Sequence, residues 1–337
     1  MVRTFAKPTW GSELRALITG VAGFAGSHLA EYLVAHTNLE VWGTDISSND
    51  RNIAQFRDDL YFVVGDISES DVASTILAQA RPDYVFHLAA QAFVPLSWRD
   101  PWQTIANNIR AQLSILQAMV NSGDKPKVLI IGSADEYGMI TPDELPITEA
   151  TPMRPYSPYA VSKIAQDMLG YQYYASHGLP IVRVRPFNHI GPRQSPAFVT
   201  SDFAKQIAEI EAGSREPPIH VGNLEAKRDF TDVRDMVRGY HLALEHGEVG
   251  EVYNLGTERA YSIRHVLDTL LAMSEVEIEV VPDPARLRLS DVPVVVSDCS
   301  KFRQQTGWRA SISLHESLHN ILEYWRERVK EARREKR

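Results

Sequence analysis

The chain contains a single cysteine, Cys299, which excludes an intramolecular disulfide framework and a zinc site built from several cysteines. It has no run of eighteen apolar residues, which excludes a transmembrane helix of ordinary length. Residues 1–8 lack the apolar core of a signal peptide, so we expect a cytoplasmic location. The eleven histidines show no metal-ligand spacing such as HExxH, and we predict no bound metal.

The chain also has no excess of positive charge, because 35 lysines and arginines face 43 acidic residues and give a net charge of −8. This balance is not that of a nucleic-acid-binding protein, and we expect neither nucleic acid nor a membrane as a partner. Apolar residues at 44% and charged residues at 23% are ordinary for a globular protein. A chain of 337 residues can bury a large core in one large unit or two coupled ones.

Strand-like and helix-like segments alternate through the first half of the chain. The strand candidates are residues 14–20, 40–44, 60–64, 84–88, 127–131 and 181–185, and the main helix candidates are 27–34, 71–80, 104–121 and 158–177. This alternation predicts an α/β fold with a doubly wound parallel sheet. After Pro186, expected helices at 200–212, 233–245, 263–273 and 314–330 and a strand at 252–255 suggest a smaller α/β region over the carboxyl edge of the sheet.

Three glycines, Gly20, Gly23 and Gly26, follow the first strand with the spacing GxxGxxG. The first permits a tight turn, the second lets a pyrophosphate approach the backbone, and the third lets the next helix pack closely. The N-terminus of that helix then faces the phosphates. With Phe24 and Ala25 between the glycines, the motif predicts a dinucleotide site, whereas its other explanation is a tight turn without a ligand.

Residues at the ends of later strands extend this predicted cofactor site. Asp45 follows the second strand, where a carboxylate accepts hydrogen bonds from the adenosine ribose and repels a 2′-phosphate, so we expect NAD(H) more than NADP(H). Arg51 is nearby and could instead accept a 2′-phosphate, which leaves the preference open. His87 is predicted to be structural. The remaining predicted cofactor contacts are Asp66, Ile67, Leu88, Ala89, Ala90 and Pro186.

Tyr159 and Lys163 lie four residues apart and therefore share one face of a predicted helix, for which Ser157 and Pro158 suit the N-cap and first turn. A nearby ammonium group stabilises a phenolate and is expected to lower the pKa of the tyrosine. Ser133, at the end of an earlier strand, is placed to bond a substrate carbonyl or hydroxyl, or alternatively to cap the strand end. The Tyr159/Lys163 pair alone is weak evidence for a catalytic site, but together with Ser133 and a glycine-rich turn it is strong evidence.

These motifs together resemble the extended short-chain dehydrogenases/reductases that act on nucleotide sugars, over nearly the whole chain. Residues 185–192 are similar to the family's nucleotide-sugar strand and loop, and residues 198–200, 221–232 and 286–293 resemble its GDP-mannose branch. The resemblance implies a Rossmann-type NAD(P)-binding domain and a smaller nucleotide-sugar-binding domain, interleaved along the chain. The expected boundaries are 13–187 plus 230–256 for the first and 188–229 plus 257–330 for the second, with extensions at 1–12 and 331–337.

The resemblance also implies an activity, the NAD(P)H-dependent reduction of the 4-keto group of GDP-4-keto-6-deoxy-D-mannose to GDP-D-rhamnose. In that reaction Tyr159 would donate a proton, Lys163 would hold the nicotinamide ribose, and Ser133 would orient the oxygen being reduced. Arg228 and Arg288 match diphosphate-binding positions, although surface ion pairs with Asp229 or Asp291 are the alternative. The other residues implied to contact the GDP-sugar are Asn188, Val199, Lys205, Asn223 and Asp291, of which Asn188 could only cap a turn and Lys205 could be solvated.

The main alternative activity is that of a GDP-mannose 4,6-dehydratase. Dehydratases carry patterns such as STDEVYG or STSELYG, whereas this chain has GSADEYG at residues 132–138. Counted back from Tyr137, Asp135 stands where the catalytic glutamate base is expected but is one methylene shorter, which favours reduction. A slip of one residue would restore an acidic pair with Glu136 and keeps the dehydratase open. A nucleotide-sugar 4-epimerase and a non-catalytic NAD(H)-binding sensor are more distant alternatives.

The helices expected at 104–121 and 158–177 carry apolar stripes at helical spacing. The resemblance places both at the monomer surface, where they would pair across a two-fold axis as a four-helix bundle, so we expect a homodimer. Core packing within one subunit is the other explanation. The stripes consist of Ile105, Ile109, Leu113, Leu116 and Val120 on one helix and Val161, Ile164, Met168 and Tyr171 on the other.

Overall fold

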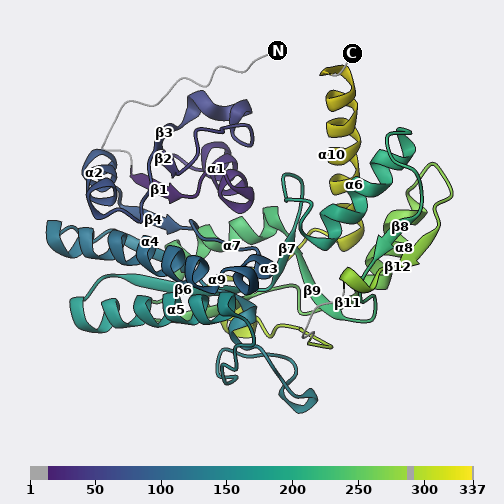
Figure 1. The fold of residues 1–337 in the computed structure, drawn as a ribbon. Coiled ribbons are helices and arrows are strands. Elements are labelled where there is room, and N and C mark those ends of the chain that lie inside the picture. The colour runs from purple at the N-terminus through teal and green to yellow at the C-terminus, as the bar shows by residue number, and fades with distance from the viewer. Residues whose placement is uncertain (1–13, 287–291, 336–337) are drawn as a thin grey trace.

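A seven-stranded sheet forms the centre of the computed structural model, which describes residues 14–286 and 292–335. The strand order is β10-β6-β5-β4-β1-β2-β3, and every neighbouring pair runs parallel (Figure 1). This confirms the predicted α/β fold with a Rossmann-type doubly wound parallel sheet. The strands are β1 (Arg15–Thr19), β2 (Glu40–Asp45), β3 (Tyr61–Val64), β4 (Tyr84–His87), β5 (Lys127–Ile131), β6 (Ile181–Pro186) and β10 (Val252–Leu255).

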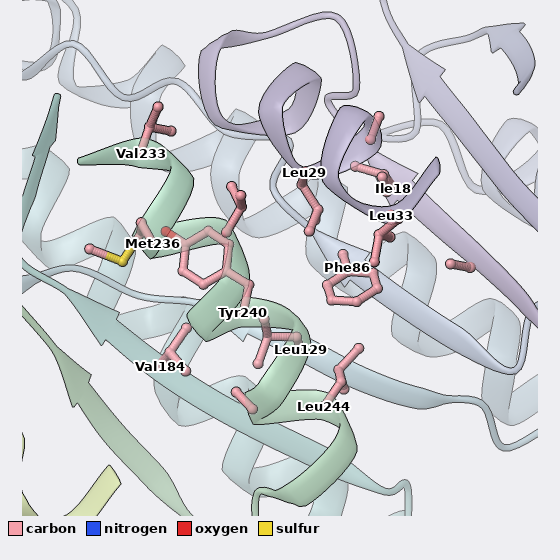
Figure 2. Close-up of a cluster of buried hydrophobic side chains, with 14 of the residues drawn as sticks. Ile18, Leu29, Leu33, Phe86, Leu129, Val184, Val233, Met236, Tyr240 and Leu244 are labelled. Atoms are coloured by element: carbon pink, nitrogen blue, oxygen red, sulfur yellow. The ribbon is translucent and has the colours of Figure 1, made fainter. Parts of the chain in front are cut away.

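Helices pack on both faces of this sheet because alternate strand residues point to opposite sides. On one face, Ile18, Phe86 and Leu129 pack with α1 and α7, as Figure 2 shows. On the other face, Leu17 and Val85 pack with α2, α4 and α5. The helices of this part are α1 (Phe24–His36), α2 (Ser70–Ala80), α3 (Val94–Arg99), α4 (Pro101–Ser122), α5 (Pro158–His177), α7 (Val233–His246) and α9 (Ser300–Thr306), with short 3₁₀ turns η1 (Ala54–Asp59), η2 (Ala134–Glu136) and η3 (Pro142–Glu144).

The second half of the chain builds a separate hydrophobic core beside the sheet, on the right in Figure 1. Strand β9 pairs with β7 in parallel and with β11 in antiparallel orientation, and β12 pairs with β8 in parallel. These elements are β7 (Asn188–Ile190), β8 (Ile219–Val221), β9 (Lys227–Asp232), β11 (Ala260–Ser262), β12 (Val280–Pro282), α6 (Val199–Glu211), α8 (Ile263–Ala272), α10 (Leu314–Glu335) and the turn η4 (Pro284–Arg286).

The boundaries of the two expected domains stay a prediction, although the packing shows where their cores lie. Phe203 of α6, Leu267 of α8 and Leu318 of α10 belong to the second core. Phe302 and Trp308, which fall inside the expected sugar-binding segment 257–330, pack instead against the core of the large sheet. Within the described part of the chain, no helix has both the length and the apolar character needed to cross a membrane.

Candidate active site

The predicted site residues gather along one edge of the large sheet. Gly20, Asp45, Leu88 and Ser133 each stand at or just after the carboxyl end of a parallel strand, so all four lie at the same edge. The strand order places β1 next to β4, which is where the winding of the sheet changes direction. Ligands of open α/β sheets bind in the crevice at this switch point.

The glycine turn has the shape that a dinucleotide requires. Gly20 has φ +72°, and a Cβ there would lie 3.0 Å from Ala89 Cα, so a larger residue would be strained in its backbone and crowded against the end of β4. A Cβ on Gly26 would lie 2.1 Å from the carbonyl oxygen of Gly20, so helix α1 can approach β1 only with glycine there. Gly23 is exposed and stands at the N-cap of α1. The turn therefore fits a pyrophosphate at the helix N-terminus.

Asp45 joins the loop after β2 to the glycine turn. Its Oδ2 accepts a hydrogen bond from the Ala22 amide at 3.1 Å, and its Oδ1 accepts one from the Ser47 amide at 3.2 Å. Arg51 forms an exposed ion pair with Glu331 of α10, with 3.5 Å between Nη2 and Oε2. The acidic group thus lies beside the turn as the sequence predicts, while the guanidinium group is engaged by the C-terminal helix.

The end of β4 is tied to β1 by a buried polar contact. Thr19 Oγ1 accepts a hydrogen bond from the Ala89 amide at 3.1 Å and lies 3.0 Å from His87 Nδ1. Burial, together with the positive charge of Lys163, lowers the pKa of His87 to about 3, so the imidazole is neutral at pH 7. A buried neutral ring that holds two strands together is consistent with a structural role for His87.

Helix α5 presents Tyr159 and Lys163 to the sheet edge. Ser157 Oγ accepts a hydrogen bond from the Ala160 amide at 3.1 Å and caps the helix, so Tyr159 falls in its first turn. Both side chains are buried, and Ser133 lies close enough to Tyr159 to lower the pKa of the phenol. Lys163 Nζ donates a hydrogen bond to the carbonyl oxygen of Ile131 at 2.9 Å. The structure therefore brings Ser133, Tyr159 and Lys163 together.

The expectation that Lys163 lowers the pKa of Tyr159 is wrong in this structure. Burial raises the pKa of Tyr159, the Asp135 carboxylate raises it further, and the nearby Ser133 opposes this. The Lys163 ammonium is held at the end of β5, and burial lowers its own pKa to about 8. The phenol therefore stays protonated at neutral pH, as a proton donor must.

The two acids of the GSADEYG segment have different surroundings. Ser133 is the N-cap of the turn η2, and its Oγ accepts a hydrogen bond from the Asp135 amide at 3.1 Å. Ser133 therefore also fills its alternative role as a cap after the end of a strand. Asp135 is half-buried and acts on Tyr159 through its charge. Glu136 is fully buried, and its Oε1 accepts a hydrogen bond from the Ser133 amide at 2.7 Å. Glu136 thus supports the serine from inside the protein.

Arg228, the first of the two predicted diphosphate ligands, does not pair with its neighbour in the sequence. Its Nη1 donates hydrogen bonds to the carbonyl oxygens of Val292 at 2.7 Å and Lys227 at 2.9 Å. Asp229 is fully buried and accepts hydrogen bonds from Ser297 Oγ at 2.6 Å and from Thr257. The alternative of an Arg228–Asp229 surface ion pair is therefore wrong. Arg288 and Asp291 lie outside the described residues.

The other predicted sugar contacts are spread over the second core. Asn188 is exposed on β7, which pairs with β9, so it lies one strand away from Arg228. Val199 begins α6 and is half-buried. Lys205 Nζ lies 3.6 Å from Glu209 Oε1 and over the ring of Trp325 of α10. Lys205 therefore contacts α10 and is not simply solvated. Asn223 Oδ1 accepts a hydrogen bond from the Glu225 amide at 2.9 Å, which forms a local turn.

Sequence reasoning missed a buried ionic cluster behind Ser133. Arg185 Nε donates to Asp167 Oδ2 at 2.7 Å and lies 3.0 Å from Glu136 Oε2, and Arg183 pairs with the other oxygen of Asp167. All four side chains are buried. Two features of the sequence point to this cluster, namely Asp167 one helical turn after Lys163 and the alternating arginines of β6.

Known proteins resemble this chain along nearly its whole length. The family described as GDP-mannose 4,6 dehydratase matches residues 17–321. A GDP-6-deoxy-D-mannose reductase of Pseudomonas aeruginosa is 36% identical over 94% of this chain and 99% of that protein. A GDP-mannose 4,6-dehydratase of Vibrio cholerae is 28% identical over 91% of this chain and 92% of that protein.

Solved structures agree with this result. The structure of RMD from Pseudomonas aeruginosa complexed with NADPH has a TM-score of 0.83 and 34% identity, covering 94% of this chain and 99% of that one. A UDP-glucose 4-epimerase from Thermotoga maritima, solved with UDP-glucose, has a TM-score of 0.86 and 30% identity, covering 94% of this chain and 100% of that one. The chain is therefore an enzyme of the extended short-chain dehydrogenases/reductases and belongs to the GDP-mannose 4,6-dehydratase family.

Proposed function

We propose that the protein reduces the 4-keto group of GDP-4-keto-6-deoxy-D-mannose and forms GDP-D-rhamnose. The proposal is supported by the placement of Ser133 beside the buried Tyr159, with Lys163 on the same helix, and by the similarity to a GDP-6-deoxy-D-mannose reductase. A bound reduced nicotinamide dinucleotide would supply the hydride. Tyr159 gives its phenolic proton to the oxygen that becomes negative, and Ser133 holds that oxygen in place. Their contribution is proton transfer and the electrostatic stabilisation of developing charge.

The surroundings of Glu136 carry the preference for reduction over dehydration. Elimination of water needs a base that reaches the proton on carbon 5 of the sugar. Glu136 is fully buried and its carboxyl group bonds the Ser133 amide, so it is not available for that role. Asp135 acts on Tyr159 but is one methylene shorter than the glutamate of the dehydratase patterns. A plain reductase needs only the Ser133, Tyr159 and Lys163 set.

We propose that NADH is preferred to NADPH. The Asp45 carboxylate lies beside the glycine turn, where it would repel a 2′-phosphate, and Arg51 is already paired with Glu331. The RMD structure from Pseudomonas aeruginosa contains NADPH, so both cofactors must be compared. The ratio of kcat/KM for NADH and NADPH measures this preference directly.

We further propose that the second core binds the GDP part of the substrate. Arg228 and Arg288 would bind the diphosphate, since guanidinium groups form paired, charge-assisted hydrogen bonds to phosphate oxygens. Asn188, on the strand next to that of Arg228, would bind the diphosphate or the sugar. The remaining contacts would come from Val199, Lys205, Asn223 and Asp291.

A homodimer through α4 and α5 is also proposed. Val120, Val161, Met168 and Tyr171 are more than a third exposed, which is unusual for such side chains on packed helices. Leu116, expected in the same stripe, is instead fully buried in the monomer core, because it faces the sheet. The other four members, Ile105, Ile109, Leu113 and Ile164, are half-buried.

Two incubations test the proposed reaction. With GDP-4-keto-6-deoxy-D-mannose and NADH or NADPH, mass spectrometry should show a product that has gained two hydrogen atoms. With GDP-mannose alone, the nucleotide sugar should remain unchanged. Loss of water from GDP-mannose would identify a dehydratase, and an isomer of equal mass would identify an epimerase. No conversion of either substrate, with the cofactor still bound, would favour the sensor.

A further inference from the structure

The glutamate that supports Ser133 occupies space that a larger residue at position 132 would fill. A Cβ on Gly132 would lie 2.3 Å from Glu136 Oε1 and 3.0 Å from the carbonyl oxygen of Val184. Aligned on their tyrosine with Tyr137, the dehydratase patterns STDEVYG and STSELYG have serine where this chain has Gly132. They have valine or leucine where this chain has Glu136. This chain differs at both positions, and the structure explains the two differences as one arrangement: the glycine makes room for the carboxyl group.

The carboxyl group of Glu136 is fixed from behind by the buried cluster. Arg185 Nε lies 3.0 Å from Glu136 Oε2 and donates to Asp167, while Arg185 Nη1 donates to Tyr137 Oη at 3.1 Å. Tyr137 Oη in turn donates to Asn254 Oδ1 of β10 at 2.6 Å. The turn η2 is therefore anchored to α5, β6 and β10 at the same time.

The two oxygens of Glu136 face different groups. Oε1 accepts the Ser133 amide hydrogen at 2.7 Å, and the buried Oε2 lies 3.0 Å from Arg185 Nε without a hydrogen bond of good geometry. Burial, together with the negative charge of Asp167, raises the pKa of Glu136 well above its usual range. The carboxyl group is therefore enclosed by protein on both sides and bonds the turn only through Oε1.

We propose that Glu136 is a positioning residue whose carboxyl group holds the Ser133 amide and thereby fixes the serine hydroxyl beside Tyr159. This inference rests on the proposed reductase function. Glu136 does not reach the substrate, and its effect passes through Ser133. Loss of its hydrogen bond frees the start of η2, which moves both the Ser133 hydroxyl and the Asp135 carboxylate relative to the phenol.

The test compares two substitutions in the full-length protein with the keto sugar as substrate. Glu136→Gln has the same shape and still accepts the Ser133 amide hydrogen, so its kcat should stay within about threefold of wild type. Glu136→Leu is apolar and cannot make this bond, so its kcat should fall by about tenfold to a hundredfold, because catalysis depends on exact placement of the reacting groups. The KM for the sugar nucleotide and the Kd for the cofactor should change by less than about threefold.

A matched control separates positioning from lost stability. Glu211 makes a partly buried ion pair with Arg326 between α6 and α10, with 2.6 Å between Arg326 Nη2 and Glu211 Oε1 and 2.7 Å between Nε and Oε2. Glu211→Leu should lower the melting temperature in a similar way but leave kcat unchanged. If Glu136→Leu does not fold, Gly132→Ala takes its place, since the added methyl group displaces the carboxyl and should cause the same loss of kcat.

Hydrogen exchange of residues 132–137 provides a readout that does not depend on the reaction. Exchange there should be faster in Glu136→Leu than in wild type and unchanged in Glu211→Leu and Glu136→Gln. A wild-type enzyme that does not reduce the keto sugar would refute the proposed function only. An active wild type whose Glu136→Leu variant keeps full kcat and slow exchange would refute the positioning role. A Glu136→Gln variant as inactive as Glu136→Leu would also refute it, because the hydrogen bond to the Ser133 amide would then not be what matters.

Discussion

Replacement of Lys163 by methionine should stabilise the cofactor-free protein while it removes activity. Lys163 is buried, and burial lowers its pKa from the usual 10.5 to about 8 despite the nearby Glu136 carboxyl group. A lowered lysine pKa means that the folded state disfavours the charged form. Methionine has a similar length and no charge, so the desolvation cost disappears in the variant.

The size of the effect follows from the pKa values. The difference between 10.5 and about 8 corresponds to about 3 kcal/mol, at ~1.36 kcal/mol for each pKa unit. The variant also loses the hydrogen bond from Lys163 Nζ to the Ile131 carbonyl oxygen, which costs about 1 kcal/mol. The net stabilisation is about 2 kcal/mol. For a chain of 337 residues, with an unfolding entropy of ~2.1 cal/mol/K per residue, this raises Tm by about 3 °C.

The pH dependence of this gain gives a sharper test. Below pH 8 the lysine is protonated in both the folded and the unfolded state, so the full penalty is present in the wild type. Between pH 8 and 10.5 the unfolded state binds more protons, so the stability of the wild type rises with pH and the advantage of the variant shrinks. Thermal unfolding at pH 7 and pH 9.5 measures both values. A variant less stable than wild type at pH 7, or an advantage that is constant with pH, would refute the reasoning.

The other expected outcomes concern turnover, cofactor choice, substrate binding and assembly. Tyr159→Phe should lower kcat by about 10²–10⁴-fold and leave cofactor Kd nearly unchanged, and a variant with nearly full rate would remove the phenol from the mechanism. Asp45→Ala should reduce the ratio of kcat/KM for NADH to kcat/KM for NADPH. A wild-type enzyme that uses NADPH as well as NADH would contradict the role of this acid. Arg228→Ala should weaken GDP binding by about tenfold to a hundredfold in calorimetric titration, with NADH binding retained, whereas exposed Arg264→Ala should change neither. Light scattering at micromolar concentration should show a dimer, which Met168→Glu should dissociate, and a wild-type monomer would exclude the proposed interface.

Features set by local patterns were predictable from the sequence. The strands and the glycine turn follow from apolar segments and from the steric needs of a tight strand–helix connection, and the structure confirms the predicted sheet. The shared face of Tyr159 and Lys163 follows from helical spacing alone. Helix α1 nevertheless begins at Phe24, within the glycine motif and before the periodic stretch that suggested it, because the exposed Gly23 serves as its N-cap.

Features set by distant contacts were not predictable. The side to which Glu136 points is decided by a three-residue 3₁₀ turn and by arginines of β6, which no pattern near Glu136 reveals. The raised pKa of Tyr159 depends on how completely the folded protein buries it, so the spacing to Lys163 gave the wrong direction. Leu116 fits a surface stripe by spacing but faces the sheet, because α4 buries a wide face against it.

The path of the chain between its two cores has a consequence for how such enzymes can be altered. After β6 the chain builds the second core with α6 and β8, returns to the large sheet with α7 and β10, leaves it for α8, returns with α9, and leaves again for α10. No single cut therefore separates the two parts. A change of substrate by exchange of the second part would need three separate segments to be replaced together, with α7, β10 and α9 of the large-sheet part left between them.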